Sequence, residues 1–243
     1  MIDLILDTNI WIHHIAMDEP KGIFNELKGF IESNEIHILS NSIIADEWMR
    51  NKETTIKNVI SKIQKQSKSA LEIKEYLPEN ERIELENILE KYKTNEKNRI
   101  EIVLSRIDDI EQMINQATQT KITDEMKLKV VDWALEKKAP FALKTNSVGD
   151  ALIILSAVEH RKKNMNKGFY PKGYFVSWNH TDYADLNDKD LIHPDLKDML
   201  ENANLHYHRY IGLALKLAPE HLMEIENYID MSIEIAKDQR RGM

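Results

Sequence analysis

The stretch Leu4-Ile5-Leu6-Asp7-Thr8-Asn9-Ile10-Trp11-Ile12 begins with an apolar run and turns abruptly to an acid, a hydroxyl and an amide. The apolar run, Ile2 to Leu6 broken only by Asp3, is typical of a buried strand in a parallel sheet, because both faces of such a sheet are covered. In open α/β sheets, ligands bind beyond the carboxyl ends of the strands, where Asp7 would lie. Taken alone, Asp7 is either a site residue or the cap of the next helix, since Asp is a favoured N-cap.

The composition is that of an ordinary globular protein. The chain has 243 residues, of which 42% are hydrophobic and 30% charged, which suits one large domain or a domain with a substantial insertion. No apolar run approaches the roughly 20 residues that span a bilayer, and no basic segment precedes the first short run, so we expect neither a membrane span nor a signal peptide. The chain has no cysteine, which excludes disulfides and thiolate metal sites and is consistent with a cytoplasmic location.

The charge is acidic in sum but unevenly distributed. A net charge of -8 argues against a general nucleic-acid coat protein, because phosphate neutralisation needs lysine and arginine. From Arg50 to Lys74, however, seven basic residues stand against two acids, whereas Glu75 to Glu111 holds eleven acids and six basic residues. The basic stripe is either a solvated helix face or a track for a nucleic-acid backbone, and Arg50 and Lys52 are its best candidates for substrate contact.

Both ends of the chain alternate short apolar strands with helical patterns. We expect strands at Ile2–Leu6, Ile36–Leu39, Tyr174–Ser177 and Asn204–Tyr210. Helical patterns lie between and after them, at Ile10–Ala16, Ile23–Ser33, Ile43–Arg50, Asp150–Arg161 and Glu220–Lys237. Strands separated by helices predict an α/β fold, with a parallel sheet flanked by helices.

Residues 52–138 have a different texture. They contain no glycine, proline only at Pro78 and no convincing strand, while apolar residues recur at helical spacing. We expect two long helices packed as an antiparallel hairpin that breaks at Leu77–Asn80, then a third helix from about Thr123 to Lys138. The chain is thus interpreted as a single domain over residues 1–243, with 52–138 as a helical insertion within it.

Four acids occupy comparable places in this scheme. Asp7 ends the first strand, Glu47 lies early in the helix that follows Ser40-Asn41-Ser42, Asp150 opens a helix and Asp182 follows a later strand. Strand ends and helix starts of a parallel sheet face one edge, so these side chains are expected to converge. Three alternatives remain open: Asp150 serves only as the N-cap of its helix, Asp46 is the site acid in place of Glu47, or Asp185 is the site acid in place of Asp182.

Convergent carboxylates repel one another, and burying them is costly unless a cation compensates. Hard oxygen ligands select Mg²⁺ or Mn²⁺, which keep open positions for water and substrate phosphate. A site of that kind activates water and steadies the leaving oxygen during displacement at phosphorus. The four acids therefore predict a hydrolytic phosphodiesterase.

Four short motifs, in order, resemble the motif blocks of PIN-domain nucleases. They are Leu-Asp-Thr-Asn at Asp7, Ala-Asp-Glu-Trp at Glu47, Gly-Asp-Ala-Leu-Ile at Asp150, and Ser177-x-Asn179-x-x-Asp182-Tyr183. The resemblance covers residues 1–50 and about 140–210, outside the helical insertion. Pro140-Phe141, shortly before the third acid, is similar to the branch of bacterial PIN proteins that carry long helical insertions.

The resemblance implies roles for individual residues. The metal ligands, direct or through water, would be Asp7, Glu47, Asp150 and Asp182. Asn9 would orient Asp7 and the scissile phosphate, while Thr8 or Ser177 would form hydrogen bonds within the site. Many PIN domains have an acid where Asn179 stands; its amide can still ligate or position a water but adds no charge, so one metal or two remains open. The loop ahead of the third acid offers further candidates for phosphate contact, which are equally well plain loop residues: Lys144, Asn146 and Ser147.

The leading functional hypothesis is a Mg²⁺/Mn²⁺-dependent nuclease. The preference for RNA over DNA, a role as a toxin or defence effector and an inhibitory protein partner are implied by the resemblance alone. A phosphatase with an aspartyl nucleophile is disfavoured, because that chemistry usually needs a second acid where Asn9 stands. The remaining alternative is a catalytically weak or inactive PIN-like scaffold, whose helical insertion binds a partner or nucleic acid or forms a homodimer.

Overall fold

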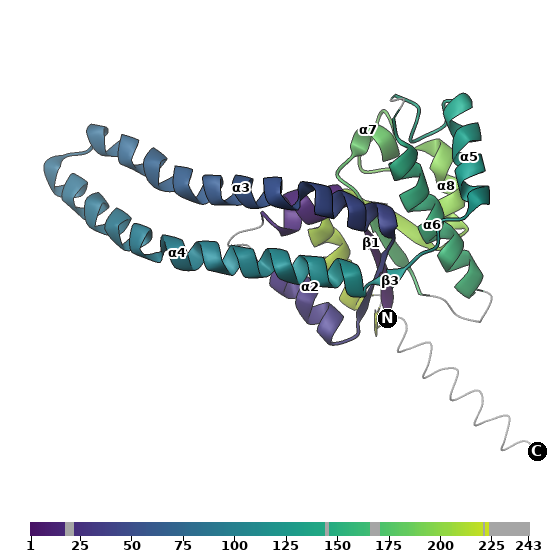
Figure 1. Cartoon of the computed structure of the whole chain (residues 1–243), viewed down its shortest axis with the longest axis horizontal. Helices are drawn as coiled ribbons and strands as arrows, with labels where there is room; N and C mark the ends of the chain where they lie inside the picture. The colour runs from purple at the N-terminus through teal and green to yellow at the C-terminus, as the bar shows by residue number, and fades with distance from the viewer. Residues whose placement is uncertain (18–21, 144–145, 166–170, 221, 224–243) are drawn as a thin grey trace, which may run out of the picture.

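A computed structural model describes residues 1–17, 22–143, 146–165, 171–220 and 222–223 of the chain (Figure 1). Its centre is a five-stranded sheet with the order β3-β2-β1-β4-β5, in which every pairing is parallel. The strands are β1 (Ile2–Leu6), β2 (Ile36–Ser40), β3 (Thr118–Gln119), β4 (Gly173–Val176) and β5 (Leu205–His208). The predicted α/β fold class with a helix-flanked parallel sheet is confirmed.

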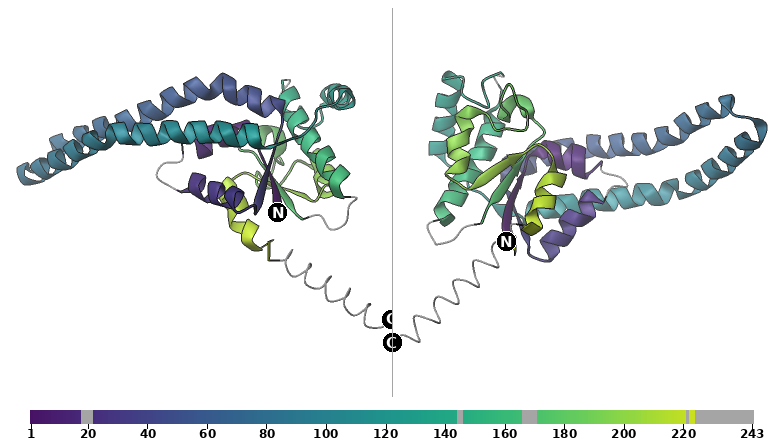
Figure 2. Two further views of the ribbon diagram at one scale, coloured as in Figure 1. Left: turned by 60° about the horizontal axis from the view of Figure 1, so that its bottom comes forward. Right: turned by 180° about the vertical axis from the view of Figure 1, so that it is seen from behind.

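Helices cover both faces of the sheet. Helix α2 (Ile23–Glu32) lies on one face together with the helical stretch 211–220, while α5 (Asp124–Leu135) and α6 (Val148–Met165) lie on the other (Figures 1 and 2). Every residue of α6 from Ala151 to Val158 is buried, because this helix packs between the sheet and α5. All five residues of the central strand β1 are buried as well, which explains its nearly continuous apolar run.

Two long helices form the predicted hairpin. Helix α3 (Ser42–Ile73) and helix α4 (Glu79–Gln116) pack along each other and project well beyond the sheet (Figures 1 and 2). A short 3-10 turn, η2 (Lys74–Tyr76), and Pro78 at the N-cap of α4 make the break at the expected place. The apolar side chains near the sheet end are buried, among them Val59, Ile63, Val103, Ile107 and Ile110.

Two local expectations are wrong. The region 52–138 does contain a strand, because β3 pairs with β2 through Leu39–Thr118 and Ser40–Gln119. Two residues are too short to leave an alternating pattern, and β3 forms only because the edge of β2 is there to pair with it. The pattern at Ile43–Arg50 is also not a separate element, since α3 continues from Ser42 to Ile73 without a break.

The remaining elements are short. The first motif continues into one turn of helix, α1 (Thr8–Ile10), and a π-helical turn, η1 (Trp11–Ile15). Helix α7 (His180–Tyr183) follows β4, and α8 (Pro194–Glu201) precedes β5. Apart from Glu220 and the residues 222–223, the predicted closing helix Glu220–Lys237 lies outside the described residues. Within the described ranges no helix is long and apolar enough to cross a membrane.

A buried ion pair joins elements at the amino edge of the sheet. Asp3 in β1 accepts a hydrogen bond from Nη1 of Arg161 in α6 at 2.5 Å, and both side chains are at most 10% exposed. Arg161 also donates to the main-chain oxygens of Ala203, Asn204 and Pro171. The acid that interrupts the first apolar run is thus a structural anchor, with its charge balanced and its hydrogen bonds made.

Candidate active site

The four predicted acids come from four elements that meet at the carboxyl edge of the sheet. Asp7 follows β1 directly, and Glu47 lies in the second turn of α3, after β2. Asp150 lies in the first turn of α6, and Asp182 lies in α7, after β4. Asn41 fixes the start of α3, because its side-chain oxygen accepts the main-chain N–H groups of Ile43 and Ile44 at 3.0 and 3.1 Å.

Asp7 is buried and is held by two neutral donors. Its Oδ2 accepts the hydroxyl of Ser177 at 2.5 Å and the amide of Asn9 at 2.6 Å. Asn9 is itself fixed, since its Oδ1 accepts the main-chain N–H of Trp178 at 3.1 Å. As N-cap residue of α1, Asp7 makes no side-chain capping hydrogen bond, so the pure capping interpretation is not supported.

Asp182 is held by a second set of neutral donors. Its Oδ2 accepts the amide of Asn179 at 2.6 Å and lies 3.4 Å from the hydroxyl of Ser147, and its Oδ1 accepts the hydroxyl of Thr181 at 3.1 Å. The main-chain N–H of Asn179 donates to Oγ of Ser177 at 3.0 Å, so Ser177 connects the surroundings of Asp182 with Asp7. The side-chain amide of Asn179 therefore fixes the carboxylate of Asp182 by a hydrogen bond and adds no charge.

Glu47 faces the first motif. Its Oε2 accepts the hydroxyl of Thr8 at 2.7 Å, whereas the neighbouring Asp46 is exposed. Gly149, in the first turn of α6, lies beside Glu47: a Cβ atom there would be in ordinary contact, 3.4 Å from Oε1 of Glu47 and 3.4 Å from Ile43. The geometry favours Glu47 over Asp46 as the acid of this helix that faces the site.

Asp150 is positioned by a buried tyrosine. The hydroxyl of Tyr183 donates to the main-chain oxygen of Asp150 at 3.0 Å and lies 3.3 Å from its Oδ1. Tyr183 is fully buried and packs edge-on against Phe175 of β4 with ring centroids 4.8 Å apart. Asp150 is the third residue of α6, so it does not occupy the N-cap position of that helix.

The acids are close enough to repel one another. Burial and, after it, repulsion from Asp7, Asp182 and Glu47 together raise the pKa of Asp150 to about 7. The net pKa of Asp7 is raised to about 6, because burial and repulsion from Glu47 outweigh the hydrogen bonds from Ser177 and Asn9 that lower it. Raised pKa values of carboxyl groups that repel one another in a desolvated cluster make this cluster a candidate functional site.

The residues predicted to contact substrate phosphate lie in different environments. Lys52 forms ion pairs with Asp108 and Glu111 of α4, whose hydrogen bonds raise the pKa of its ammonium group. Arg50 is exposed and donates to the main-chain oxygen of Asp46 at 3.2 Å. Asn146 is exposed, Ser147 is buried against Asp182 as described above, and Lys144 lies outside the described residues.

Sequence reasoning missed three contributors to this site. Tyr183, Thr181 and Gly149 each stand beside a predicted acid in the chain, and Gly149 and Tyr183 belong to the quoted motifs, but nothing in the sequence assigned a role to any of the three. Only the close approach of α6 to α3, and of α7 to α6, gives them a role. Their position next to a motif acid is the one signal that the sequence carries.

The donor set fits a hard divalent cation by its chemistry. All four acids offer oxygen ligands, their charges repel, and burial makes that repulsion expensive. Among the described residues, however, no group of three or more His, Asp or Glu side chains stands in a geometry that could hold a metal ion. Hydroxyl and amide donors engage one oxygen each of Asp7 and Glu47 and both oxygens of Asp182, and the remaining lone pairs of these carboxylates can still bind a cation.

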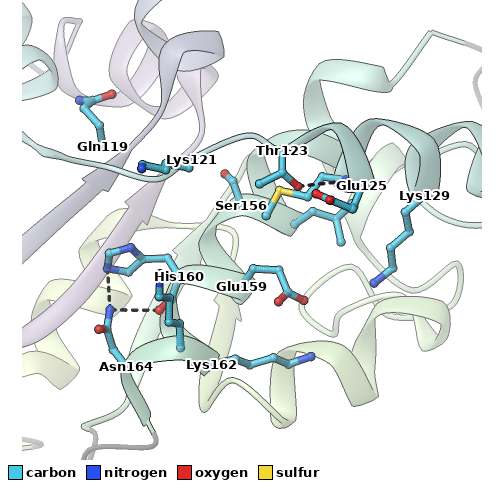
Figure 3. A pocket seen from close by; sticks show the side chains of 13 residues that line it. Gln119, Lys121, Thr123, Glu125, Lys129, Ser156, Glu159, His160, Lys162 and Asn164 are labelled. Atoms are coloured by element: carbon cyan, nitrogen blue, oxygen red, sulfur yellow. Dashed lines mark hydrogen bonds between the residues drawn. The ribbon is translucent and has the colours of Figure 1, made fainter.

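A large cavity lies elsewhere on the molecule. It encloses about 960 Å³ between α5, α6 and the chain that follows β3, and Figure 3 shows the side chains that line it. Its lining includes Lys121, Lys129 and Lys162 together with Glu125 and Glu159, and it contains none of the four acids. The cavity belongs to the C-terminal half of α6, whereas Asp150 lies at the start of that helix.

A comparison with protein families agrees with the motif resemblance. A family model described as "PIN domain" matches residues 4–183, which include all four acids and the helical hairpin. Among curated proteins and among solved structures, none matches the chain.

Proposed function

Because the chain belongs to the PIN-domain family, whose members are generally nucleases, we propose that its acidic cluster is the active site of a divalent-metal-dependent nuclease. The observation that carries the proposal is the convergence of Asp7, Glu47, Asp150 and Asp182, which is strong enough for each of three acids to raise the pKa of Asp150. Carboxylates that repel one another at the carboxyl edge of a parallel sheet do not stabilise the fold.

The chain's own residues divide the work. Asp7, Glu47, Asp150 and Asp182 would hold Mg²⁺ or Mn²⁺, directly or through water. Such an ion, when bound, supplies an activated water and neutralises charge on the phosphate during hydrolysis of a phosphodiester bond.

The neutral donors position the acids. Ser177 and Asn9 orient Asp7, and Thr8 orients Glu47. Asn179 and Ser147 orient Asp182, and Tyr183 orients Asp150. These residues are positioning residues, and their loss is expected to weaken the site less than loss of an acid.

The direct test is cleavage of labelled single-stranded RNA, structured RNA and DNA, each with Mn²⁺ and with chelator. We expect cleavage with Mn²⁺ alone, and a loss of at least about 100-fold in Asp7→Asn and Asp150→Asn, because each removes a charge that the metal needs. The matched control is Asp46→Asn, which changes an exposed acid beside Glu47 and should cleave like the wild type. Full activity in both purified site variants would overturn the assignment.

The finer assignments belong to the same proposal. RNA as the substrate, and a role as a toxin or defence effector with an inhibitory partner, rest on resemblance to other members of the family. Growth of cells with and without induced expression tests the effector role. Growth arrest by the wild type that disappears in Asp150→Asn supports it, and equal growth in both contradicts it.

One observation favours a different function, that of a catalytically inactive scaffold. The described residues present no group of three acids ready to hold a metal, and Asn179 stands where many members of the family have an acid. Calorimetry with Mn²⁺ separates the two functions. Saturable binding that is lost in Asp150→Asn supports the nuclease, whereas no binding at millimolar metal supports the scaffold.

A further inference from the structure

Two exposed aromatic rings lie in contact at the carboxyl edge of the sheet. Trp178 follows β4 and is 37% exposed, and Tyr210 follows β5 and is 45% exposed. Their ring centroids are 5.0 Å apart, with the rings edge-on at 71°. The other three tryptophans, Trp11, Trp48 and Trp133, are at most 5% exposed, so an exposed Trp–Tyr pair is the exception in this chain.

An arginine is packed against both rings. The guanidinium carbon of Arg209 lies 4.9 Å from the ring centroid of Trp178 and 5.2 Å from that of Tyr210, and Nη1 lies 3.3 Å from Asp190. The side chain of Arg209 is only 14% exposed, so its guanidinium group is held against the two rings. We call Trp178, Arg209 and Tyr210 the aromatic platform.

The aromatic platform is joined to the acidic cluster by the backbone of one segment. Residues on either side of Trp178 hold the acids: Ser177 donates to Asp7 and Asn179 donates to Asp182. The main-chain N–H of Trp178 donates to Asn9, which in turn donates to Asp7. A shift of the Trp178 backbone would therefore move the acids, and the reverse also holds.

The strand order gives the aromatic platform a direction. Strands β1, β4 and β5 are neighbours in parallel order, so their carboxyl ends form a row. Asp7 follows the first of these strands, Ser177 and Trp178 the second, and Arg209 and Tyr210 the third. A chain that crosses the acidic cluster along this row reaches the aromatic platform next.

We propose that the aromatic platform stacks an unpaired base of a single-stranded nucleic acid, next to the phosphodiester bond held at the acidic cluster; this inference rests on the proposed nuclease function. Every base has a π-face that stacks on an aromatic ring, and a fixed arginine strengthens the contact. Bases in a duplex are already stacked on one another, so single strands are the preferred ligand.

Charge supports stacking as the source of affinity. The protein carries a net charge of -8, and Lys52, on the helix of Glu47, is engaged by two acids. Binding that depends on stacking persists as salt rises, whereas binding by phosphate contacts falls steeply. The aromatic platform thus predicts an affinity for single strands whose salt dependence does not change when Trp178 is replaced.

The test measures binding of labelled 12-nucleotide single strands, as RNA and as DNA, to the full chain with Asp150→Asn to prevent cleavage. Adding Trp178→Ala or Tyr210→Ala should weaken binding about 5- to 100-fold, as expected for one lost base stack. Trp178→Phe should retain most of the affinity. The matched control is Tyr76→Ala, which removes an aromatic ring that is 89% exposed at the tip of the hairpin and should change nothing.

A matched ligand separates bases from backbone. An oligonucleotide with central abasic sites should bind the parent protein as weakly as the intact strand binds Trp178→Ala. Equal binding of intact and abasic strands would contradict the proposed base stacking, as would undiminished binding in both Trp178→Ala and Tyr210→Ala. In either case, metal-dependent cleavage by the wild type would still support the nuclease proposal.

Two further outcomes are also decisive. If the wild type neither cleaves nor binds nucleic acid, the proposed function fails and the aromatic platform fails with it. If the wild type self-associates and Trp178→Ala is monomeric with unchanged strand binding, the exposed rings form a protein interface and the proposal is wrong. Far-ultraviolet circular dichroism of each variant identifies any loss caused by unfolding.

Discussion

At the scale of single residues, the site combines four charged acids with neutral donors. Ser177, Asn9, Asn179 and Thr8 each supply a hydroxyl or an amide to a carboxylate, so neutral hydrogen-bond donors orient the acids. The hydrogen bonds to Asp7 lower its pKa, but burial outweighs them and the net pKa rises to about 6. The cluster therefore retains a repulsion that a divalent cation can relieve.

A first prediction concerns the stability of the metal-free protein. The pKa of Asp150 is raised to about 7 from 3.8, so between these values the native state binds more protons than the unfolded state. The free energy of unfolding therefore falls as pH rises through this window. Asp150→Asn should be more stable than the wild type at pH 8 by on the order of 2 kcal/mol, and about equal to it below pH 4.

Thermal melts with chelator at pH 4 and pH 8 measure this difference. Millimolar Mn²⁺ should then raise the melting temperature of the wild type and leave that of Asp150→Asn almost unchanged, because a ligand that binds only the native state stabilises it. Asp46→Asn serves as the exposed control. If Asp150→Asn is less stable than the wild type at pH 8 with chelator, the repulsion between the acids described above is contradicted.

A second prediction concerns the amide of Asn179. In Asn179→Asp, a carboxylate replaces the amide that lies 2.6 Å from Oδ2 of Asp182, so a repulsion replaces a hydrogen bond. At pH 8 with chelator, we expect the free energy of unfolding of Asn179→Asp to be about 1–3 kcal/mol lower than that of the wild type, as measured by urea unfolding. Mn²⁺ should stabilise Asn179→Asp more than it stabilises the wild type.

Asn179→Ala is the control, because it loses the hydrogen bond without adding charge. It should lose stability without any added gain from Mn²⁺. An equal response of all three proteins to Mn²⁺ would show that position 179 does not contribute to metal binding.

At the scale of elements, the amino edge of the sheet is fixed by a contact between a strand and a helix. Gly173, the first residue of β4, lies so close to Arg161 of α6 that a Cβ atom there would overlap the guanidinium group. Arg161 cannot move away cheaply, because it donates to Asp3 and to three main-chain oxygens. Glycine is required here by the close approach, with no left-handed backbone involved.

A third prediction follows for this contact. Gly173→Ala should destabilise the protein by about 3–5 kcal/mol, the range expected when a buried ion pair is broken. The matched control is Gly29→Ala in α2, where a Cβ atom meets nothing within 4 Å and the helix should gain up to about 1 kcal/mol. Urea unfolding of both variants measures the difference, and equal stabilities would refute the close approach.

At the scale of the whole molecule, the hairpin has a base and a tip with different packing. Near the sheet, Val59, Ile63, Val103 and Ile107 are buried, and Glu47 lies at the start of α3. Farther out, apolar side chains such as Ile73, Tyr76, Ile83 and Ile88 are at least half exposed. The base therefore belongs to the core that carries the site, while the tip adds little buried apolar surface.

A fourth prediction separates the two parts. Replacing residues 69–88 by a short turn removes the tip and the surface ion pair Lys74–Glu86, which is worth at most about 1 kcal/mol. The shortened protein should fold, keep its stabilisation by Mn²⁺ and cleave short single strands within about threefold of the wild type. A loss of cleavage with an unchanged response to Mn²⁺ would assign the tip a direct role in binding substrate.

Much of the fold can be predicted from local patterns of apolar and polar residues in the sequence. The apolar run Ile2–Leu6 predicts its strand to the residue, and Pro78 marks the turn of the hairpin. Strands separated by helices predict the parallel sheet, because connections between parallel strands must cross its faces. Asp7, Glu47, Asp150 and Asp182 are identifiable from their places at strand ends and helix starts. What stays hidden are features without a local period, such as the two-residue strand β3 and the unbroken course of α3.

The fold class, the family motifs and the acids of the candidate site can be read from the amino-acid sequence, since each depends on the order of residues along one element. The surroundings of those acids come from the folding of distant segments onto one another: Ser177 lies between Asp7 and Asn179, Tyr183 lies against Asp150, and Lys52 is paired with acids of α4. This folding also brought Trp178 and Tyr210 together at the end of two neighbouring strands. The physical reason is that hydrogen bonds, ion pairs and ring contacts act over a few ångströms in space, between residues whose separation along the chain carries no pattern.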